Sequence, residues 1–326
     1  MGVSDSGSDS RPGSRLLLAV SLVAALLLGA IALSSFGIGE SPIAAWLASA
    51  RRAGVALSVA RLRWPQARLP AHSLCVLAIM KNETLNLKEW AAHYRWQGAS
   101  AVVLLNNGGG DDVDEAGWRA ELRGFEDFVT VLDAPLPHSQ EPQYNDIGRP
   151  WLEARGCEFV AVLDLDEFLY VRRPAVSLRA AVAAAFDAAG AGTALLACPW
   201  LMFGSSGLVA HPRGSVRTNF TWRAAQPHVL HKSIARLASL VRLKAHEHET
   251  LGGKAGCPPD LALNHYAIQS REYFAAVKMS RGDVCCKEYE GVRTWDYFRG
   301  FDFREVEDTA LRDLVQQEEG VAVTTF

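Results

Sequence analysis

The chain has little net charge and no internal repeats. It carries 33 lysine and arginine residues against 36 aspartate and glutamate residues, a formal net charge of −3 over 326 residues. Nothing in that balance indicates nucleic-acid binding, so no nucleic-acid partner is expected. The six cysteines contain no C-x-x-C pair, which argues against a zinc ribbon or a thioredoxin-like motif. A bridge from Cys257 to Cys285 or Cys286 is one candidate disulfide, and free buried thiols are the alternative.

Charge is also missing from a long stretch near the N-terminus. Residues 16–33 are Leu, Ala, Val and Ile interrupted only by Ser21 and Gly29, and no charge appears between Arg15 and Glu40. At ~1.5 Å per residue, this stretch is long enough to cross a bilayer core of ~30 Å. A cleaved signal peptide has a shorter apolar region of ~7–15 residues, so the pattern favours an uncleaved membrane anchor at 16–38.

The anchor separates parts of different composition. Residues 1–15, rich in Ser, Gly and Asp, are expected to be disordered, residues 39–71 to form a stem, and residues 72–326 to form one globular domain. Between positions 41 and 70 the stem has five arginines and no acidic residue. By the positive-inside rule this excess would hold the globular domain in the cytoplasm, although the first helix and its context can override such a count.

The globular domain alternates between strand and helix patterns. Apolar runs at 74–80, 101–105, 128–132 and 159–163 predict buried strands. An apolar stripe at helical spacing in 85–97, ended by Gly98, and an alanine-rich segment in 174–189 predict helices. This alternation indicates an α/β fold with a mixed, mostly parallel, Rossmann-like sheet flanked by helices.

The most informative stretch is residues 159–170, FVAVLDLDEFLY, where an apolar run ends in Asp164-Leu165-Asp166-Glu167. An unpaired buried carboxylate is very costly, so these side chains are expected where the strand leaves the sheet. Asp164 and Asp166 are two residues apart and point to the same side of a strand. Two carboxylates there suit Mg²⁺ or Mn²⁺. The alternative is a solvated acidic turn.

Three other polar clusters follow predicted strands: Lys81-Asn82-Glu83, Asn106-Asn107 and Asp111-Asp112. The carboxyl ends of parallel strands share one edge of a sheet, so the clusters could converge on one crevice. Such a crevice would suit a nucleotide diphosphate held by a metal ion. Ordinary turn chemistry is the alternative for each cluster.

A series of short motifs continues along the chain in a defined order. They are KNETLNLKEWAAHYRWQGA at 81–99, LLNNGGGDD at 104–112, QYN at 143–145, LDLDEF at 163–168, WLMFG at 200–204, HK at 231–232 with Arg236, NHY at 264–266 and KMSRG at 278–282. Together they resemble glycosyltransferase family 92 and the related family 2-like glycosyltransferases over residues 73–310. Asn106 replaces an acid of the family pattern, and the segment at Gln143 is shortened.

The resemblance implies a GT-A fold and transfer of a sugar from a UDP- or GDP-linked donor to a glycan or other hydroxyl acceptor. Asp164 would face the donor ribose and the metal, Asp166 would ligate Mn²⁺ (or Mg²⁺) directly, and His265 would be the third protein ligand. Lys278 and Arg281 would pair with the diphosphate. The remaining implied contacts are Lys81, Asn82, Glu83 and Asn107 with the nucleoside, and Trp200, Phe203, Gly204 and Glu167 around the sugar or acceptor.

The resemblance also suggests inversion at the sugar, which requires a general base for the acceptor hydroxyl. Glu247 is the first choice, with Glu249, Asp260 and Glu167 as alternatives. Two other functions remain open: a haloacid-dehalogenase-type phosphatase, which also has D-x-D after a strand, and a membrane-anchored, non-catalytic carbohydrate-binding module. A eukaryotic enzyme of this type would be a single-pass membrane protein facing the Golgi lumen, and a cytoplasmic-facing anchor is the alternative.

Overall fold

The computed structural model describes residues 67–108, 112–173 and 175–324. The expected tail and anchor, and most of the expected stem, lie outside these ranges. Within the ranges, no helix is both long enough and apolar enough to cross a membrane. The described residues belong to one compact unit, Gln66–Phe326, which contains the expected globular domain.

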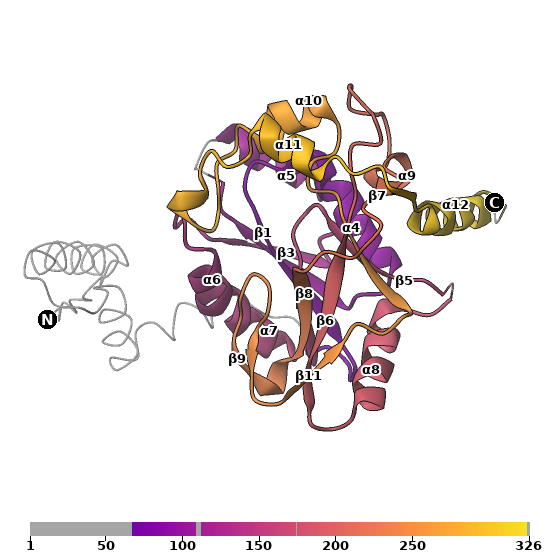
Figure 1. Cartoon of the computed structure of the whole chain (residues 1–326). Helices are drawn as coiled ribbons and strands as arrows, with labels where there is room; N and C mark the ends of the chain where they lie inside the picture. Colours follow the sequence, from indigo (N-terminus) through magenta and orange to yellow (C-terminus); the bar gives the residue numbers. More distant parts are fainter. Residues whose placement is uncertain (1–66, 109–111, 174, 325–326) are drawn as a thin grey trace, which may run out of the picture. The chain divides into compact units, whose positions relative to one another are not determined.

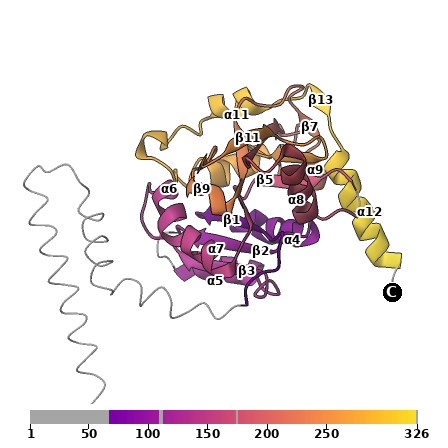
Figure 2. The ribbon, with the colours of Figure 1, turned by 90° about the horizontal axis from the view of Figure 1, so that it is seen from below.

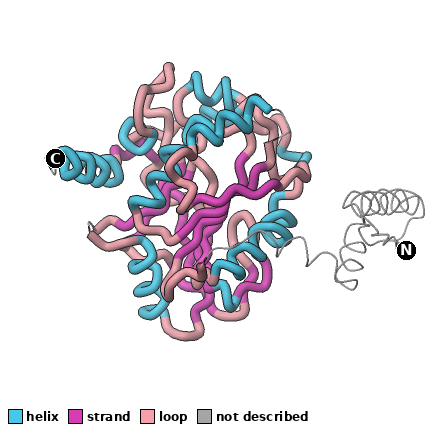
Figure 3. The backbone as a smooth tube through the Cα atoms, turned by 180° about the vertical axis from the view of Figure 1, so that it is seen from behind, coloured by secondary structure: helices cyan, strands magenta, loops and turns pink. Residues whose placement is uncertain are grey.

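A mixed sheet of nine strands runs through the unit, with helices on its faces (Figures 1 and 3). Along the sheet the order is β3-β2-β1-β4-β8-β6-β12-β5, and β11 pairs with β6 off this path. Parallel pairs outnumber antiparallel ones, which confirms the expected α/β fold with a mostly parallel sheet. The strands are β1 (Leu74–Met80), β2 (Ala101–Asn106), β3 (Val129–Asp133), β4 (Phe159–Val162), β5 (Glu167–Val171), β6 (Thr193–Met202), β8 (His231–Arg236), β11 (Gly253–Gly256) and β12 (Leu261–His265).

Two strands determine which residues reach the carboxyl edge of the parallel part. β8 is antiparallel to both β4 and β6, so its first residues, not its last, lie at that edge. β12 runs parallel to β6 and ends at His265, which brings that residue to the same edge. Residues from the start of one strand and the ends of others therefore meet there.

The helices cover the sheet, and four short strands form two small additional sheets (Figure 2). The longer helices are α4 (Leu87–Trp96), α5 (Asp112–Glu121), α7 (Arg149–Arg155), α8 (Leu178–Ala189), α11 (Trp295–Phe301) and α12 (Ala310–Thr324). Short turns are α6 (Gln140–Gln143), α9 (Val216–Asn219) and α10 (Arg271–Tyr273), with π-helical turns η3 (Tyr144–Gly148) and η5 (Phe274–Lys278). The small sheets pair β9 (Leu240–Arg242) with β10 (Glu249–Thr250), and β7 (Trp222–Arg223) with β13 (Val306–Glu307).

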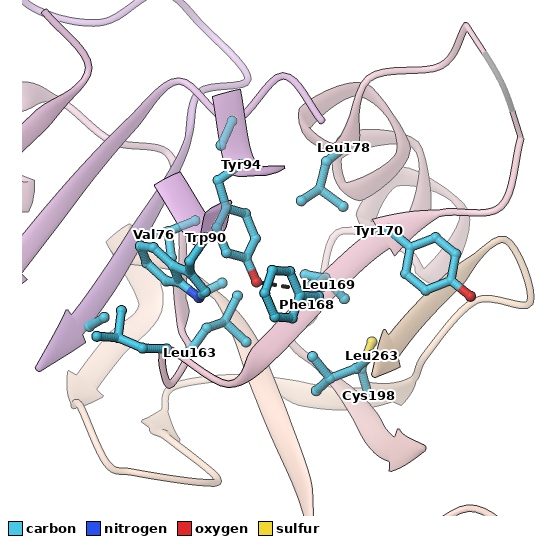
Figure 4. Close-up of a cluster of buried hydrophobic side chains, with 14 of the residues drawn as sticks. Val76, Trp90, Tyr94, Leu163, Phe168, Leu169, Tyr170, Leu178, Cys198 and Leu263 are labelled. Atoms are coloured by element: carbon cyan, nitrogen blue, oxygen red, sulfur yellow. Dashed lines mark hydrogen bonds between the residues drawn. The ribbon is translucent and has the colours of Figure 1, made fainter. Parts of the chain in front are cut away.

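Helix α4 packs against the acidic turn on the core side, through the buried side chains of Trp90 and Tyr94 (Figure 4). Its Trp90 and Tyr94 are fully buried, as the apolar stripe predicts. The Trp90 indole donates to the carbonyl oxygens of Asp164 (2.9 Å) and Glu167 (3.1 Å). The Tyr94 hydroxyl donates to the carbonyl of Glu167 at 2.9 Å and accepts from the amide of Leu169 at 3.0 Å. The core thus fixes the backbone from which the carboxylates project.

All six cysteines are paired, as Cys75–Cys157, Cys198–Cys257 and Cys285–Cys286. The expectation of a bridge from Cys257 to Cys285 or Cys286 is wrong, and so is that of free thiols. The physical reason is strand pairing, which sequence alone does not reveal. β11 lies parallel to β6 with Gly256 opposite Ala197, so the next residue of each strand brings Cys257 beside Cys198.

Candidate active site

A cavity of about 380 Å³ lies at the carboxyl edge of the sheet. Its wall is formed by residues from separate parts of the chain, including the turn after β1, helix α6, the turn after β4, and the ends of β6, β8 and β12 that meet there. The segment 278–297, together with Ala245, His246 and Ala267, supplies the rest of the lining. This arrangement is the one expected for a ligand site in an open α/β sheet.

The turn after β4 carries the two aspartates. The backbone amide of Glu167 donates to the carbonyl of Asp164 at 3.0 Å, and the Glu167 carboxylate accepts from the Asp164 amide at 2.8 Å. These bonds close the turn on itself. Leu165 faces the core, and the side chains of Asp164 and Asp166 line the cavity, 37% and 9% exposed.

Asp164 has a buried lysine as its partner. The Lys232 ammonium lies 2.9 Å from Oδ2 of Asp164 and 3.5 Å from Oε2 of Glu167. Burial alone lowers the pKa of Lys232, but the two carboxylates more than offset it and raise that pKa, so the side chain is cationic. Burial raises the pKa of Asp164, and Lys232 outweighs it, which leaves the aspartate pKa lowered. Burial raises the pKa of Glu167 to about 7, because it has no contact with solvent.

Asp166 is part of a second ionic cluster. The Lys278 ammonium lies 2.6 Å from Oδ2 of Asp166 and 2.7 Å from Oε1 of Glu83. Arg281 pairs with the other oxygen of Glu83. His265 Nε2 lies 3.4 Å from Oδ1 of Asp166. Burial raises the pKa of Asp166, yet Lys278 and His265 bring it well below its usual value. Burial lowers the pKa of His265, and Asp166 more than reverses this, so it is raised.

An aromatic wall stands beside the aspartates. The Trp200 ring is 4.4 Å from the His265 ring and 5.2 Å from the His246 ring, centroid to centroid. All three residues line the cavity. A largely buried indole flanked by imidazoles offers an apolar face next to charged groups, which suits a ligand with both a ring and hydroxyl or phosphate groups.

The structure brings seven of the residues chosen from the sequence to this cavity: Glu83, Asp164, Asp166, Trp200, His265, Lys278 and Arg281. Lys81 and Asn82 lie next to the lining, with the Lys81 ammonium 3.4 Å from the carbonyl of Asp283. The functional roles assigned to all of these residues stay predictions.

Other chosen residues lie behind the cavity wall or outside it. Asn107 is buried and donates to the carbonyls of Ala134 (2.6 Å) and Leu136 (3.0 Å). Phe203 packs in the core, and a side chain at Gly204 would meet the backbone of Phe303 at 2.3 Å. Glu167 is fully buried beneath the turn.

Glu247 is also outside the lining. Its carboxylate is 45% exposed and is held by Lys254 at 2.8 Å and His231 at 2.9 Å. The hydrogen bond from Lys254 is the main reason why the pKa of Glu247 is lowered.

Several lining residues had no role in the sequence-based prediction: Gln140, Glu141, Lys232, His246, Asp283, Tyr289, Arg293 and Tyr297. Lys232 stood in a motif, and its pairing with Asp164 could not be read from spacing. The others lie in short turns or irregular segments, where no periodic pattern marks the residues that face a cavity.

The side chains of Asp164, Asp166 and His265 fit a divalent cation by their chemistry, since two carboxylates and one imidazole are suitable ligands for Mn²⁺. However, the described part of the chain contains no group of three His, Cys, Asp or Glu side chains placed to hold an ion together. Each aspartate is paired with a lysine instead. A metal ion at this position would therefore have to compete with these ammonium groups.

The fold and cavity define an α/β protein with a charged ligand site at the carboxyl edge of its sheet.

No protein-family model matches the chain. Its sequence is 28% identical over 285 residues to a glycosyltransferase family 92 protein of Oryza sativa subsp. japonica, covering 77% of this chain and 45% of the relative. Proteins of the same designation from Ricinus communis (26%; 76% and 47%) and Arabidopsis thaliana (25%; 78% and 48%) match similarly. These similarities confirm the resemblance to glycosyltransferase family 92. The chain spans about half the length of these curated relatives.

Among solved structures, a mannosyltransferase of Pyrobaculum calidifontis in complex with GDP-Man and Mn²⁺ is 16% identical, with a TM-score of 0.38 over 83% of this chain and 78% of that one. A glucosyl-3-phosphoglycerate synthase of Mycobacterium tuberculosis, in complex with Mn²⁺, UDP and its product, is 12% identical, with a TM-score of 0.30 over 52% and 58%. Both likenesses are distant.

Proposed function

We propose that this chain is a metal-dependent glycosyltransferase with a GT-A-type fold, which moves a sugar from a UDP- or GDP-linked donor to a glycan or other hydroxyl acceptor. The observation that carries the proposal is the convergence of seven family-motif residues on one cavity. They come from five separate segments of a chain that is similar to family 92 glycosyltransferases.

The charges of the cavity suit a nucleotide diphosphate. Lys232, Lys278, Arg281 and Arg293 line it together with the aspartates. Arginine can bind phosphate through two parallel hydrogen bonds, and lysine acts as a point charge. Asp164, Asp166 and His265 would hold Mn²⁺ or Mg²⁺. The ion would offset the negative charge that develops on the leaving nucleotide diphosphate. The Trp200 face next to His265 would pack against a sugar ring.

Inversion would require a base within hydrogen-bonding reach of the acceptor hydroxyl. The cavity geometry favours Glu141 over the sequence-based choice, Glu247. The Glu141 side chain lines the cavity and accepts from the Ala245 amide at 3.2 Å. Among the described residues it has no basic partner, whereas the other lining carboxylates each pair with a lysine or an arginine.

We also propose that the globular domain faces an oxidising compartment, the Golgi lumen if the source is eukaryotic, with residues 16–38 as its anchor. Cys75–Cys157 and Cys198–Cys257 join residues 82 and 59 positions apart. Disulfides between distant positions form and persist mainly outside the cytosol. The two disulfides therefore support the lumenal side of the membrane, whereas the arginine excess of the stem favours the cytoplasmic side. Protease protection on sealed membranes tests it, and cleavage of the domain without detergent would place it in the cytoplasm.

A panel of UDP- and GDP-sugars, UDP-galactose first, tests the activity on the full chain in detergent with Mn²⁺. We expect metal-dependent release of UDP or GDP by the wild type and no release by Asp166→Asn, with circular dichroism showing that both proteins are folded. Hydrolysis of p-nitrophenyl phosphate without sugar-nucleotide turnover would instead favour the phosphatase. Glycan binding without any turnover would favour the carbohydrate-binding module.

A further inference from the structure

Both carboxylate oxygens of Asp166 already have a partner. Oδ2 lies 2.6 Å from the Lys278 ammonium, and Oδ1 lies 3.4 Å from Nε2 of His265. The Lys278 side chain is 1% exposed and reaches Oε1 of Glu83 at 2.7 Å. A divalent ion that binds Oδ2 of Asp166 would meet the Lys278 ammonium there, so this side chain would have to move away.

The Lys278 ammonium is stabilised in its place between Glu83 and Asp166. Glu83 and Asp166 are two carboxylates in a mostly buried place, and removing their shared cation would leave uncompensated charge, which is strongly unfavourable. A divalent ion next to Asp166 would supply the same compensation as Lys278. The two cations are thus alternatives at Oδ2 of Asp166. A displaced Lys278 would keep Glu83 as its one remaining partner among the ion pairs of the described residues.

A bound diphosphate would supply a second anion for Lys278. Lys278 and Arg281 both line the cavity, and both are held only through Glu83 and Asp166 among the ion pairs of the described residues. Phosphate oxygens near them would give each side chain a new partner of the same charge. Arg281, paired with Glu83, would continue to compensate that carboxylate.

We propose that Lys278 is the resident counterion of Asp166, and that a divalent ion replaces it there only when a nucleotide diphosphate offers Lys278 a new partner. The proposal rests on the proposed function for the identity of the nucleotide. By linkage, the nucleotide then raises the affinity for the metal by the same factor by which the metal raises the affinity for the nucleotide.

Mn²⁺ affinity of the full chain, measured by electron paramagnetic resonance with and without UDP or GDP, tests this without any turnover. For the wild type we expect weak Mn²⁺ binding that the matching nucleotide tightens at least tenfold. For Lys278→Met we expect Mn²⁺ to bind at least tenfold tighter than to the wild type when no nucleotide is present, and nucleotide to add less than threefold. Lys278→Arg, which keeps the cation, should behave as the wild type does.

Arg293→Gln is the matched control, because Arg293 lines the same cavity but pairs with Asp283, at 3.0 Å, instead of Asp166. In the absence of nucleotide, this substitution should change the Mn²⁺ affinity less than threefold. If Arg293→Gln and Lys278→Met raised the Mn²⁺ affinity equally, the loss of any positive charge from the cavity would explain the effect. That result would overturn the proposal. So would unchanged or weaker Mn²⁺ binding by Lys278→Met, and Lys278→Gln repeats the measurement if the methionine variant does not fold.

The counterion role of Lys278 and the glycosyltransferase activity can be contradicted separately. A wild type that transfers sugar, but whose Mn²⁺ affinity does not depend on Lys278, overturns the counterion role alone. In a second case, Lys278→Met binds Mn²⁺ more tightly than the wild type does, but the wild type neither binds nor turns over any nucleotide sugar. Competition between Lys278 and the metal at Asp166 would then still hold. That result would contradict the glycosyltransferase and the coupling to a nucleotide.

Discussion

The Lys232 ammonium lies 2.9 Å from the carboxylate of Asp164 and is 2% exposed, so the first acidic residue of the D-x-D turn is held by a buried cation from the start of β8. The same lysine is 3.5 Å from the fully buried Glu167. One side chain thus compensates two carboxylates, one facing the cavity and one beneath it.

Replacing Lys232 by methionine is expected to destabilise the protein by about 3–5 kcal/mol, because Glu167 and Asp164 would lose their shared cation. Chemical unfolding followed by tryptophan fluorescence measures this. Lys254→Met is the control, since its ion pair with Glu247 is half exposed and should be worth less than about 1 kcal/mol. The double variant Lys232→Met/Glu167→Gln should recover part of the loss. Equal stability of the wild type and Lys232→Met would contradict this role.

Glutamine substitutions at Glu141 and Glu247 distinguish the two candidate bases. Glu141→Gln is expected to lower kcat by about 10²-fold or more, the usual contribution of a general base. Glu247→Gln should change it less than tenfold, because its carboxylate is exposed and held by Lys254 and His231 outside the cavity lining. Initial rates of UDP or GDP release at saturating acceptor measure both. A reversed order of effects would restore the sequence-based choice.

His248 predicts a loss of stability in mild acid. Burial, and after it the charge of Lys232, lowers the pKa of this histidine to about 3. The unfolded chain therefore takes up the proton first as the pH falls below about 6.5, and the stability that the neutral side chain contributes above that pH is lost progressively towards pH 3. We expect His248→Gln to reduce the slope of unfolding free energy between pH 6.5 and 5 by up to about 1.4 kcal/mol per pH unit.

His72→Gln is the control for that slope, because the His72 side chain is 62% exposed. Urea unfolding of each variant at several pH values gives the comparison. The buried His93 and the half-buried His246, whose pKa values burial also lowers, act in the same direction, so part of the slope should remain in His248→Gln. A slope identical to that of the wild type would show that His248 does not stay neutral in the folded state.

The sequence predicted the strands of the parallel half within a residue or two, because β1 and β4 are fully buried apolar runs and β2 is one up to its last residue, Asn106. It did not define β8, whose sequence HKSIAR lacks such a run. Its charged residues form ion pairs with distant residues: Lys232 with Asp164, and Arg236 with Glu158. The same limit applied to the site. The acidic turn was visible as a local pattern, while the lysines that compensate it come from distant segments, Lys232 from β8 and Lys278 from the end of η5.

The disulfides Cys75–Cys157 and Cys285–Cys286 are expected to differ in their effect on stability. Cys75→Ala/Cys157→Ala opens a link across 82 residues and should cost about 4.5 kcal/mol by the loop-entropy relation. Cys285→Ala/Cys286→Ala opens a link between neighbours, which restricts the unfolded chain very little, so a change within about 1 kcal/mol is expected. Unfolding under non-reducing conditions measures both, after peptide mapping of the pairs. A larger cost for the neighbouring pair would indicate that it supports the folded cavity wall directly.

Strand β12 is held on both sides by ladders of opposite direction, parallel to β6 and antiparallel to β5. Each ladder fixes its own register, with His265 opposite Met202 in one and opposite Glu167 in the other. A deletion of one residue within β12 that leaves the start of the strand in register would move Tyr266 into the position of the imidazole. Both ladders would then lose their register beyond the deletion. An insertion in the preceding turn, around Pro258 and Pro259, leaves both registers unchanged. For the engineering of this chain, the turn is the place where length can vary, and the strand is the place where it cannot.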